Sequence, residues 1–297
     1  MTRQTAKGSI VLLAGPTASG KSRLAAEMAL ARGGIVINAD SMQVYRELRV
    51  LSARPVREEE AGVPHRLYGH VGAATRYSVG AWLADIAPVL AEAQRGQQPV
   101  VVVGGTGLYF KALTEGLATV PPIPVSVREA AAAEAAGMET EALHAVLAAR
   151  DPEDAAAVRP SDRSRIARAL EVFAATGRSL ASWKAMTSSP PLVLPEAAER
   201  LVVVPDTAEL HRRISARADA MVGAGGVEEA EALGALSLDP AMPAMKAIGV
   251  REFLAHLSGK LSLEEALTAI KTETRRYAKR QMTWIRSQMA GWSGLAG

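Results

Sequence analysis

The sequence predicts an α/β protein, in which a parallel sheet is flanked by helices and a separate helical segment is inserted. Short apolar runs rich in Val and Ile alternate with longer stretches of helical periodicity, as in parallel sheets covered on both faces. Three of these runs, residues 10–13, 35–37 and 99–103, end in glycines or polar residues. From residue 121 the composition becomes alanine-rich with helical spacing, and a strand pattern returns at residues 200–205.

Composition limits the possible functions. The chain has 297 residues, of which 48% are hydrophobic, enough for one large domain or a core with an insertion. It contains no cysteine, which excludes disulfides, thiolate metal sites and a cysteine nucleophile. The net charge of +3 argues only weakly for a polyanionic partner. The apolar stretch after residue 8 is too short for a signal peptide and no run has transmembrane length, so we expect a cytoplasmic protein without membrane contact.

The first motif is a phosphate-binding loop between a strand pattern and a helical stretch. It consists of Gly15, Pro16, Thr17, Ala18, Ser19, Gly20, Lys21 and Ser22. The pattern G-x-x-x-x-G-K-[S/T] supplies backbone N–H groups for phosphate oxygens, a lysine that neutralises charge, and a hydroxyl that holds Mg²⁺. We therefore expect a core like that of P-loop NTPases. The loop does not specify the ligand, because helix N-termini bind nucleotides and pyrophosphate alike.

The next two strand patterns deliver polar residues to the same edge of the expected sheet. Asp40 follows the strand at 35–37, and a glycine-rich loop around Thr106 follows the strand at 99–103. Ligands of open α/β sheets bind at the carboxyl ends of strands, so we expect Asp40 beside the phosphate loop. A helix-capping role for Asp40 or Ser41 stays open. The strand at 99–103 lacks a terminal aspartate, so the usual Walker B magnesium ligand is missing and an ordinary ATPase is disfavoured.

Two further stretches of the core are less regular or plainly helical. Residues 51–77 have no sustained period and are interpreted as a loop with a short helix. His65 and His70 have no other metal-ligating residues near them in sequence, so we interpret them as ordinary loop histidines. Residues 79–93 carry apolar side chains at helical spacing and predict a helix.

A helical insertion is expected at residues 119–198, between core segments 1–118 and 199–297. Its helical patterns cover residues 127–136, 139–149 and 161–175, and proline-rich stretches at 121–124 and 187–191 frame it. Two acidic residues, Asp162 and Glu171, oppose five arginines here, namely Arg159, Arg163, Arg165, Arg168 and Arg178. A solvated helix face explains this excess as well as a polyanion site does.

The last third of the chain is predicted to be helical. We expect helices at 211–222 and 244–257, and a long one that begins with a capping box at Ser262 and continues to about Met289. On the long helix the large residues Ile270, Tyr277 and Trp284 are spaced seven apart, which predicts that they lie on one buried stripe. One glutamate opposes six cations on it: Lys271, Arg275, Arg276, Lys279, Arg280 and Arg286. Like charges at this spacing destabilise a helix, which favours phosphate-backbone binding over a plain solvated face.

Five blocks of the sequence together resemble one enzyme family over nearly the whole chain. They are Gly15 to Ser22, Asp40-Ser41-Met42-Gln43-Val44-Tyr45, Gly104-Gly105-Thr106-Gly107-Leu108-Tyr109, Arg165-Ile166-Ala167-Arg168-Ala169-Leu170-Glu171 and Lys279-Arg280-Gln281-Met282-Thr283-Trp284-Ile285-Arg286. The phosphate loop alone is generic, whereas the five blocks in this order resemble the bacterial tRNA dimethylallyltransferases.

The resemblance implies an activity and a set of site residues. The family transfers a dimethylallyl group from dimethylallyl pyrophosphate to N6 of adenosine 37, next to the tRNA anticodon, and its helical insertion grips the anticodon stem-loop. Gly15 to Ser22 would hold the pyrophosphate, and Ser22 would bind Mg²⁺. Asp40 would be the general base, Thr106 would contact the adenosine, and Arg217 would bind the pyrophosphate.

The resemblance also implies a set of tRNA-binding residues and a channel for the flipped base. The tRNA-binding residues would be Asp40, Ser41, Met42, Gln43, Thr106, Arg128, Ser164, Arg165, Ile166, Ala167, Arg168, Lys246, Arg251, Lys279, Arg280, Gln281, Trp284 and Arg286. The base must leave its stack to reach Asp40, so a channel through the protein is expected. We expect the protein to act as a monomer.

Two departures and three alternatives accompany this interpretation. Ser22 stands where threonine is more frequent, and residues 49–54 differ from the usual family segment, so the roles of Ser52 and Arg54 are open. A P-loop kinase of a small metabolite would use the same loop but does not need the basic C-terminal helix. A non-catalytic RNA-binding module would leave the loop and Asp40 unexplained. A prenyltransferase of free adenine nucleotides would share the core without needing the insertion.

Overall fold

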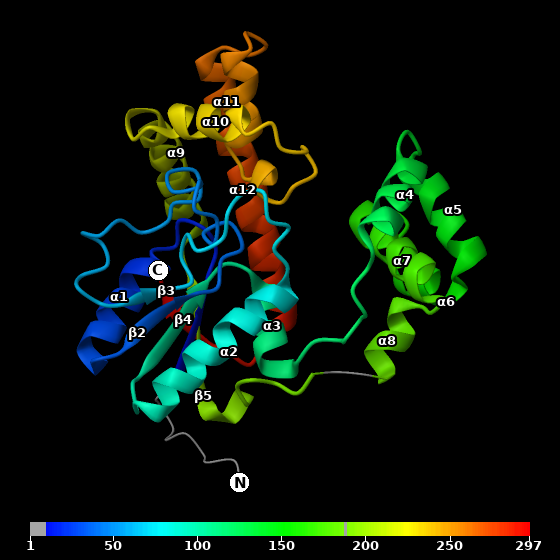
Figure 1. Cartoon of the computed structure of the whole chain (residues 1–297). Coiled ribbons are helices and arrows are strands. Elements are labelled where there is room, and N and C mark those ends of the chain that lie inside the picture. Colours follow the sequence, from blue (N-terminus) through cyan, green and yellow to red (C-terminus); the bar gives the residue numbers. More distant parts are fainter. Residues whose placement is uncertain (1–9, 187–188) are drawn as a thin grey trace. The chain divides into compact units, whose positions relative to one another are not determined.

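The chain divides into two compact units (Figure 1). The computed structural model describes residues 10–186 and 189–297, so the expectations for residues 1–8 and for Thr187 and Ser188 lie outside the described part. The described residues of Met1–Thr114 and Leu192–Gly297 form a core unit, and Glu115–Pro191 form a helical unit. The sequence places these boundaries at residues 119 and 198. None of the helices in the described part is long and apolar enough to cross a membrane.

A parallel sheet runs through the core unit. Within the described residues its six strands have the order β3-β2-β4-β1-β5-β6. They are β1 (Ile10–Ala14), β2 (Ile35–Asn38), β3 (His65–Arg66), β4 (Val100–Gly104), β5 (Ala198–Val204) and β6 (Ser293–Ala296). β4 lies between β1 and β2, with Val102 opposite both Leu12 and Ile37. The α/β prediction is confirmed, and the carboxyl ends of these three strands are neighbours.

Helices cover both faces of the sheet. The core unit contains α1 (Lys21–Arg32), α2 (Val79–Arg95), α3 (Gly107–Glu115), α9 (Thr207–Gly223), α10 (Gly226–Ala235), α11 (Val250–Leu257), α12 (Leu263–Gln288) and the 3-10 turns η1 (Pro195–Ala197) and η2 (Ala244–Lys246). Ala25 and Ala29 of α1 pack on one face of the sheet. Trp82 of α2, Phe110 of α3 and Ile285 of α12 pack on the other. The inner strands β1, β2 and β4 are buried on both sides, which explains their continuous apolar runs.

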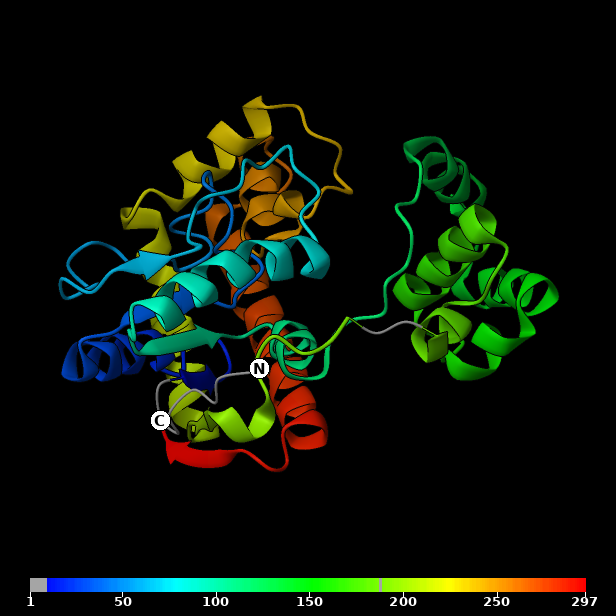
Figure 2. The ribbon, with the colours of Figure 1, turned by 60° about the horizontal axis from the view of Figure 1, so that its bottom comes forward.

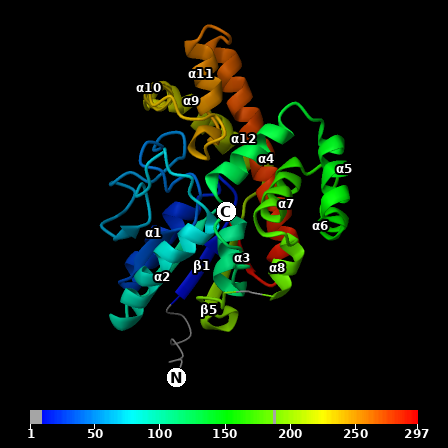
Figure 3. The same cartoon turned by 45° about the vertical axis from the view of Figure 1, so that its right-hand side comes forward.

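A second apolar cluster joins α9, α10 and α11 to the first half of α12, at one end of that long helix (Figure 3). Its fully buried members include Ala230, Phe253 and Ile270. Tyr45 and Leu48, from the segment after β2, pack into the same cluster. The chain that follows Asp40 is thereby held against the C-terminal helices.

The helical unit has a core of its own, and its helices gather around it (Figure 2). It consists of α4 (Val125–Ala135), α5 (Thr140–Arg150), α6 (Pro152–Ala157), α7 (Arg163–Thr176) and α8 (Leu180–Met186). Leu143, Leu147 and Ile166 are at most 1% exposed and form its centre. The apolar periodicity of α5 and α7 is therefore satisfied within the unit.

Two expectations for secondary structure are wrong. Residues 51–77 contain no helix, only turns and the short strand β3, which pairs with β2 through Val36 and His65. The helix expected at 244–257 is interrupted between η2 and α11, where Gly249 has a φ of 104°. A Cβ at Gly249 would lie 2.8 Å from a methyl carbon of Leu51, so both backbone angle and packing require glycine here.

Candidate active site

The phosphate loop connects β1 to α1, and its residues from Thr17 to Ser22 line a cavity. Gly20, the residue before α1, has a φ of 84°, and Ala18 has a φ of 61°, a conformation uncommon for a residue with a side chain. Lys21 is buried, and its Nζ donates a hydrogen bond of 3.1 Å to the carbonyl of Pro16. The hydroxyl of Ser19 is buried without a partner. An anion at the start of α1 can use these groups together with the helix dipole.

The buried Lys21, the partly buried Arg217 and the carboxylate of Asp40 set the charge of the site. Burial lowers the pKa of Lys21 to about 8, while Asp40 raises it and Arg217 lowers it further. Burial also lowers the pKa of Arg217, and Asp40 opposes that shift. The Nε of Arg217 is buried and makes no hydrogen bond. The excess positive charge and the unpartnered donor are suited to an anionic ligand.

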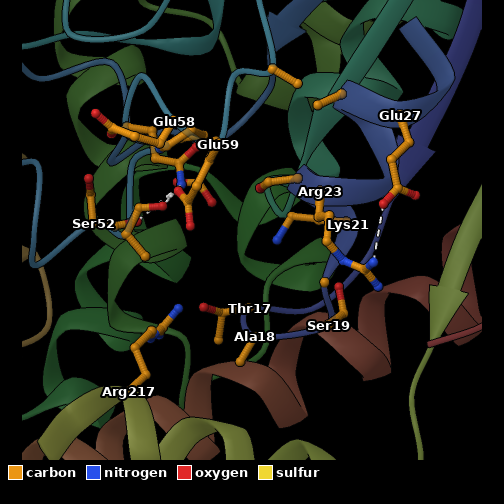
Figure 4. A pocket seen from close by; sticks show the side chains of 18 of the residues that line it. Thr17, Ala18, Ser19, Lys21, Arg23, Glu27, Ser52, Glu58, Glu59 and Arg217 are labelled. Atoms are coloured by element: carbon orange, nitrogen blue, oxygen red, sulfur yellow. Dashed lines mark hydrogen bonds and ion pairs between the residues drawn. The ribbon is translucent and has the colours of Figure 1, made fainter. Parts of the chain in front are cut away.

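A cavity of about 490 Å³ lies against the phosphate loop (Figure 4). Lys21 reaches it from α1 and Arg217 from α9. A second cavity of about 230 Å³ has in its lining Lys246 of η2 and Tyr277 and Arg280 of α12. The lining residues shared by both cavities are Thr17, Asp40, Ser52 and Arg217. The two cavities therefore meet at Asp40, with the phosphate loop on one side and basic helices on the other.

Asn38 fixes the backbone of Asp40. Its Oδ1 accepts the N–H of Asp40 at 2.8 Å, and its Nδ2 donates to the carbonyl of Asp40 at 3.0 Å. Asn38 is completely buried. Oδ1 of Asp40 accepts the N–H of Met42 at 2.9 Å, which closes a turn. No helix follows Asp40, so the helix-capping alternative is wrong, and this carboxylate oxygen closes a turn instead. Oδ2 of Asp40 makes no hydrogen bond within the described residues.

The loops after β2 and β4 are joined directly. The N–H of Thr106 donates to the carbonyl of Ala39 at 3.2 Å. Oγ1 of Thr106 accepts the N–H of Ser41 at 2.9 Å and lies 3.3 Å from the Ser41 hydroxyl. A Cβ at Gly104 would lie 2.0 Å from the Ala39 carbonyl oxygen, so the close approach of these loops depends on glycine. Asp40 is held between two strand ends.

The segment from Leu51 to Ala53 lies beside both cavities, and Ser52 lines the two of them. The carboxylate of Glu229 in α10 accepts three consecutive backbone N–H groups, from Arg49, Val50 and Leu51, at 2.7 to 2.9 Å. The Nε2 of Gln43 donates to the carbonyls of Ser52 and Ala53 at 3.1 and 2.9 Å. These contacts hold Ser52 at the meeting point of the cavities.

α12 presents cations outward and polar groups inward. Lys279, Arg280 and Arg286 are exposed, and no ion pair of their side chains is found in the described part of the chain. Gln281 is only 6% exposed and contacts the phosphate loop. Tyr277 lines the second cavity, and burial together with the charge of Asp40 raises its pKa, so its phenol stays protonated. The guanidinium of Arg280 lies over the Tyr277 ring, 5.6 Å from its centroid.

Comparison with known proteins identifies the family. The model of the family described as IPP transferase matches residues 43–288, and that of isopentenyl transferase matches residues 8–72. A tRNA dimethylallyltransferase of Methylobacterium nodulans is 55% identical over 95% of this chain and 93% of its own length. This chain belongs to the tRNA dimethylallyltransferase family. A relative from Nitrobacter hamburgensis with the same name is 54% identical over 94% of this chain and 88% of its own.

Solved structures of the family agree with the fold. A tRNA isopentenylpyrophosphate transferase from Bacillus halodurans superimposes with a TM-score of 0.69 at 32% identity and covers 98% of this chain and 90% of its own. A eukaryotic dimethylallyltransferase acting on tRNA superimposes with a TM-score of 0.78 at 26% identity, over 95% of this chain and 71% of its own. The chain is thus a prenyltransferase by family, and the kinase alternative is not favoured.

The tRNA dimethylallyltransferase residues expected at the centre of the site do lie together. The phosphate loop, Asp40 and Arg217 line one cavity, and Thr106 holds the loop of Asp40. Of the expected tRNA-binding residues in the core unit, those that line the second cavity are Asp40, Ser41, Met42, Lys246 and Arg280. The side chains of Gln43 and Gln281 are instead buried and bonded inside the protein.

The expected tRNA-binding residues of the helical unit differ in exposure. Ser164, Arg165 and Arg168 are exposed on α7, while Ile166 is completely buried in the core of the unit. The Ile166 side chain is therefore not available to RNA, because the apolar stripe of α7 includes it. Arg163, counted in the basic cluster, donates to the carbonyls of Ala135 and Met138 at 2.6 and 2.7 Å and stabilises the end of α4. Arg128 and Ala167 are partly exposed.

Sequence reasoning missed Asn38 and Glu229. Asn38 was visible as a polar residue at the end of an apolar strand, a pattern that often marks a site residue. Nothing near Glu229 in the sequence connects it with residues 49–51, because the contact depends on the packing of α10 against the segment after β2.

Proposed function

We propose that this chain transfers the dimethylallyl group of dimethylallyl pyrophosphate to N6 of adenosine 37 of tRNA, with pyrophosphate as the leaving group. The observation that carries the proposal is the pair of cavities that meet at Asp40. One is bounded by the phosphate loop and Arg217, and the other by the cations of η2 and α12. A pyrophosphate donor and a nucleic-acid acceptor would enter from opposite sides and react between them. The names of the relatives support the same pair of substrates.

The proposed chemistry is a substitution at C1 of the dimethylallyl group. The lone pair of the adenine N6 forms the new N–C bond, and the electrons of the C1–O bond leave with pyrophosphate. Asp40 accepts the proton that N6 loses, which contributes about 10²–10⁴-fold to the rate for a positioned base. Lys21, Arg217 and the loop amides stabilise the charge of the leaving pyrophosphate. The uncommitted Oδ2 of Asp40 and the unpartnered Nε of Arg217 support these roles.

Mg²⁺ fits this site through Ser22 and the substrate. Among the described residues no group of three or more His, Cys, Asp or Glu side chains could hold a metal ion. Mg²⁺ usually keeps several waters and binds through substrate phosphates with one or two protein ligands. Ser22, in the first turn of α1, lines the phosphate cavity and would be that protein ligand. When bound, Mg²⁺ supplies positive charge to the pyrophosphate oxygens.

The second cavity is proposed to receive the flipped adenine. Tyr277, Met42 and Ile248 offer aromatic and apolar surface there, and Ser41 offers a hydroxyl. Flipping costs a few kcal/mol of unstacking, which phosphate contacts of the exposed cations on α12 would offset. We further propose that α7 of the helical unit, through Arg165 and Arg168, binds the anticodon stem-loop. The protein would act as a monomer in the cytoplasm, where its tRNA substrate is found.

The test is transfer of label from dimethylallyl pyrophosphate to tRNA. Purified protein is incubated with Mg²⁺, labelled dimethylallyl pyrophosphate and bulk tRNA, and label is counted in precipitated RNA and located by nucleoside analysis. Parallel reactions with AMP as acceptor, and with labelled ATP in place of the prenyl donor, test the alternatives. The proposal predicts label on adenosine 37 alone. Label on free AMP only, or phosphate transfer from ATP, would overturn it.

A further inference from the structure

Gln281 is a buried polar residue on the helix that carries the exposed cations. The buried face of α12 is formed by Ala266, Ile270, Thr274, Ala278, Gln281 and Ile285. Gln281 is 6% exposed, whereas Lys279 and Arg280 beside it are exposed. A buried amide is costly unless its donor and acceptor are both satisfied, so a leucine would be the simple choice at this position. The side chain therefore has a task that an apolar residue could not perform.

Both ends of the Gln281 amide are bonded to backbone groups at the carboxyl edge of the sheet. Its Oε1 accepts the N–H of Thr17 in the phosphate loop at 2.9 Å. Its Nε2 donates to the carbonyl of Gly105, directly after β4, at 3.0 Å. β1 and β4 are adjacent strands, so one side chain bridges the two loops that leave them.

The second of these loops lies against Asp40. A Cβ placed on Gly105 would be 3.4 Å from Oδ2 of Asp40 and 2.2 Å from Nε2 of Gln281. Gly105 therefore permits the amide and the carboxylate to approach it together. Thr17, at the other end of the bridge, is one of the residues that line both cavities.

A neighbouring residue of α12 strengthens the same attachment. Trp284 lies against Gly107 at the start of α3, where a Cβ would be 2.1 Å from its Nε1. Gln281 and Trp284 are three residues apart and so lie on one face of the helix. α12 thus contacts the loop after β4 at two points and the phosphate loop at one.

We propose that Gln281 is a positioning residue, which sets the spacing between the phosphate loop and Asp40 and ties both to the basic helix α12. This inference rests on the proposed function, because it concerns the distance between the leaving pyrophosphate and the base. Misplacement of reacting groups by about 1 Å can cost a factor of about 10² in rate. Gln281 acts through backbone groups and is not expected to touch tRNA.

The experiment compares Gln281→Met with the matched variant Gln288→Met. Methionine keeps the length of glutamine but neither donates nor accepts strongly, so it removes both bridge bonds with little change in volume. Gln288 lies on the same helix, is exposed, and accepts a hydrogen bond only at the surface, from Lys111. Single-turnover prenyl transfer, tRNA affinity with its salt dependence, and affinity for inorganic pyrophosphate are measured for each variant.

We expect Gln281→Met to lower the single-turnover rate by about 10- to 100-fold and to leave the tRNA affinity and its salt slope within about twofold of the wild type. Gln288→Met should match the wild type in all three measurements. A Gln281→Met rate within twofold of the wild type would overturn the inference. A loss of tRNA affinity with an unchanged rate would also overturn it, because Gln281 would then contact RNA.

An inactive wild type and an unfolded Gln281→Met variant each still leave a test of the bridge. If the wild type transfers no label, the proposed function fails, and the pyrophosphate affinity still tests the bridge, since Gln281→Met should weaken it by a measurable factor of about 3 to 10. If Gln281→Met does not fold, Gln281→Asn replaces it. Asparagine keeps a buried amide but is one methylene too short to reach both Thr17 and Gly105, so the same loss of rate is expected, and a wild-type rate would contradict the inference.

Discussion

The backbone N–H of Ser41 donates a hydrogen bond of 2.9 Å to Oγ1 of Thr106, although the two residues are 65 positions apart in the chain. This bond joins the loop after β2 to the loop after β4. Asp40 precedes Ser41, so the backbone beside Asp40 is held by a side chain from the loop after another strand. The site is therefore assembled from loops that are bonded to each other before any substrate is present.

Thr106→Val removes the acceptor for the Ser41 amide and keeps the side-chain shape. Loss of a partner by a partly buried N–H costs about 1–3 kcal/mol, and we expect the transfer rate at saturating tRNA to fall about tenfold. Thr106→Ser retains the oxygen and should stay within about twofold of the wild type. If Thr106→Val raises the KM for tRNA and leaves kcat unchanged, Thr106 binds the tRNA substrate and does not position Asp40.

Removal of the outward cations of α12 tests the RNA-binding surface. The double variant Lys279→Ala, Arg280→Ala should weaken tRNA binding and make the log–log salt slope shallower by about 1 to 2, because two phosphate contacts are lost. Filter binding at several salt concentrations provides the measurement.

The matched control removes two cations from the opposite edge of the sheet. Arg32 and Arg95 lie in the last turns of α1 and α2, the helices that lead into β2 and toward β4. Arg32→Ala with Arg95→Ala should leave the salt slope unchanged. An equal effect of the two double variants would show that overall charge, and not α12, determines the affinity.

The lowered pKa of Lys21 predicts a pH dependence of pyrophosphate binding. In the empty site Lys21 is mostly charged below pH 8 and mostly neutral above it, since burial lowers its pKa to about 8. Pyrophosphate binds the charged form, so the affinity should fall by about tenfold per pH unit above pH 8. Lys21→Met lacks the titrating group, so the pH dependence of its affinity reports the titration of pyrophosphate alone. Dividing the wild-type affinity by that of Lys21→Met isolates the contribution of Lys21. If the ratio of the two affinities is constant from pH 7 to pH 10, Lys21 does not titrate in this range.

The separate core of the helical unit predicts its own sensitivity to mutation. Leu147 is completely buried among Leu143, Ile166 and other apolar side chains of that unit. Leu147→Ala should cost about 2–5 kcal/mol of the stability of the helical unit. Calorimetry should show that the helical unit of the variant unfolds at a lower temperature than in the wild type. Pyrophosphate binding at the core unit should be unchanged. Loss of pyrophosphate binding together with the early transition would mean that the two units unfold as one.

The strands β1, β2, β4 and β5 and the phosphate loop are predictable from the sequence because their signals are local, whereas β3 and β6 were not predicted. The buried strand at Val100–Gly104 shows as a run of β-branched residues, and the start of α12 shows as a capping box at Ser262. The break before α11 occurs at Gly249, whose φ of 104° is open to glycine. Glycine is a weak helix former, so a break at this position was visible in the sequence, although the expected helix was carried through it.

Only some residues of the candidate site could likewise be predicted from the sequence. Asp40 and Arg217 could be named from motifs, but a motif block does not show which of its side chains point outward. Gln281 lies within a basic block, and only the fold reveals that its amide bridges Thr17 and Gly105. Glu229 could not be found either, since carboxylates that bind backbone amides have no sequence pattern of their own.

The central claim is that Asp40 accepts the proton from the attacking amine, between the two cavities. The most direct measurement is single-turnover prenyl transfer by Asp40→Asn at saturating dimethylallyl pyrophosphate and tRNA, with tRNA affinity measured in parallel. Asparagine keeps the Oδ1 that closes the turn with Met42 but cannot accept the proton at neutral pH. The account predicts a rate about 10²–10⁴-fold below the wild type with unchanged tRNA affinity. A wild-type rate would show that the base lies elsewhere and that the meeting point of the cavities is not the reaction centre.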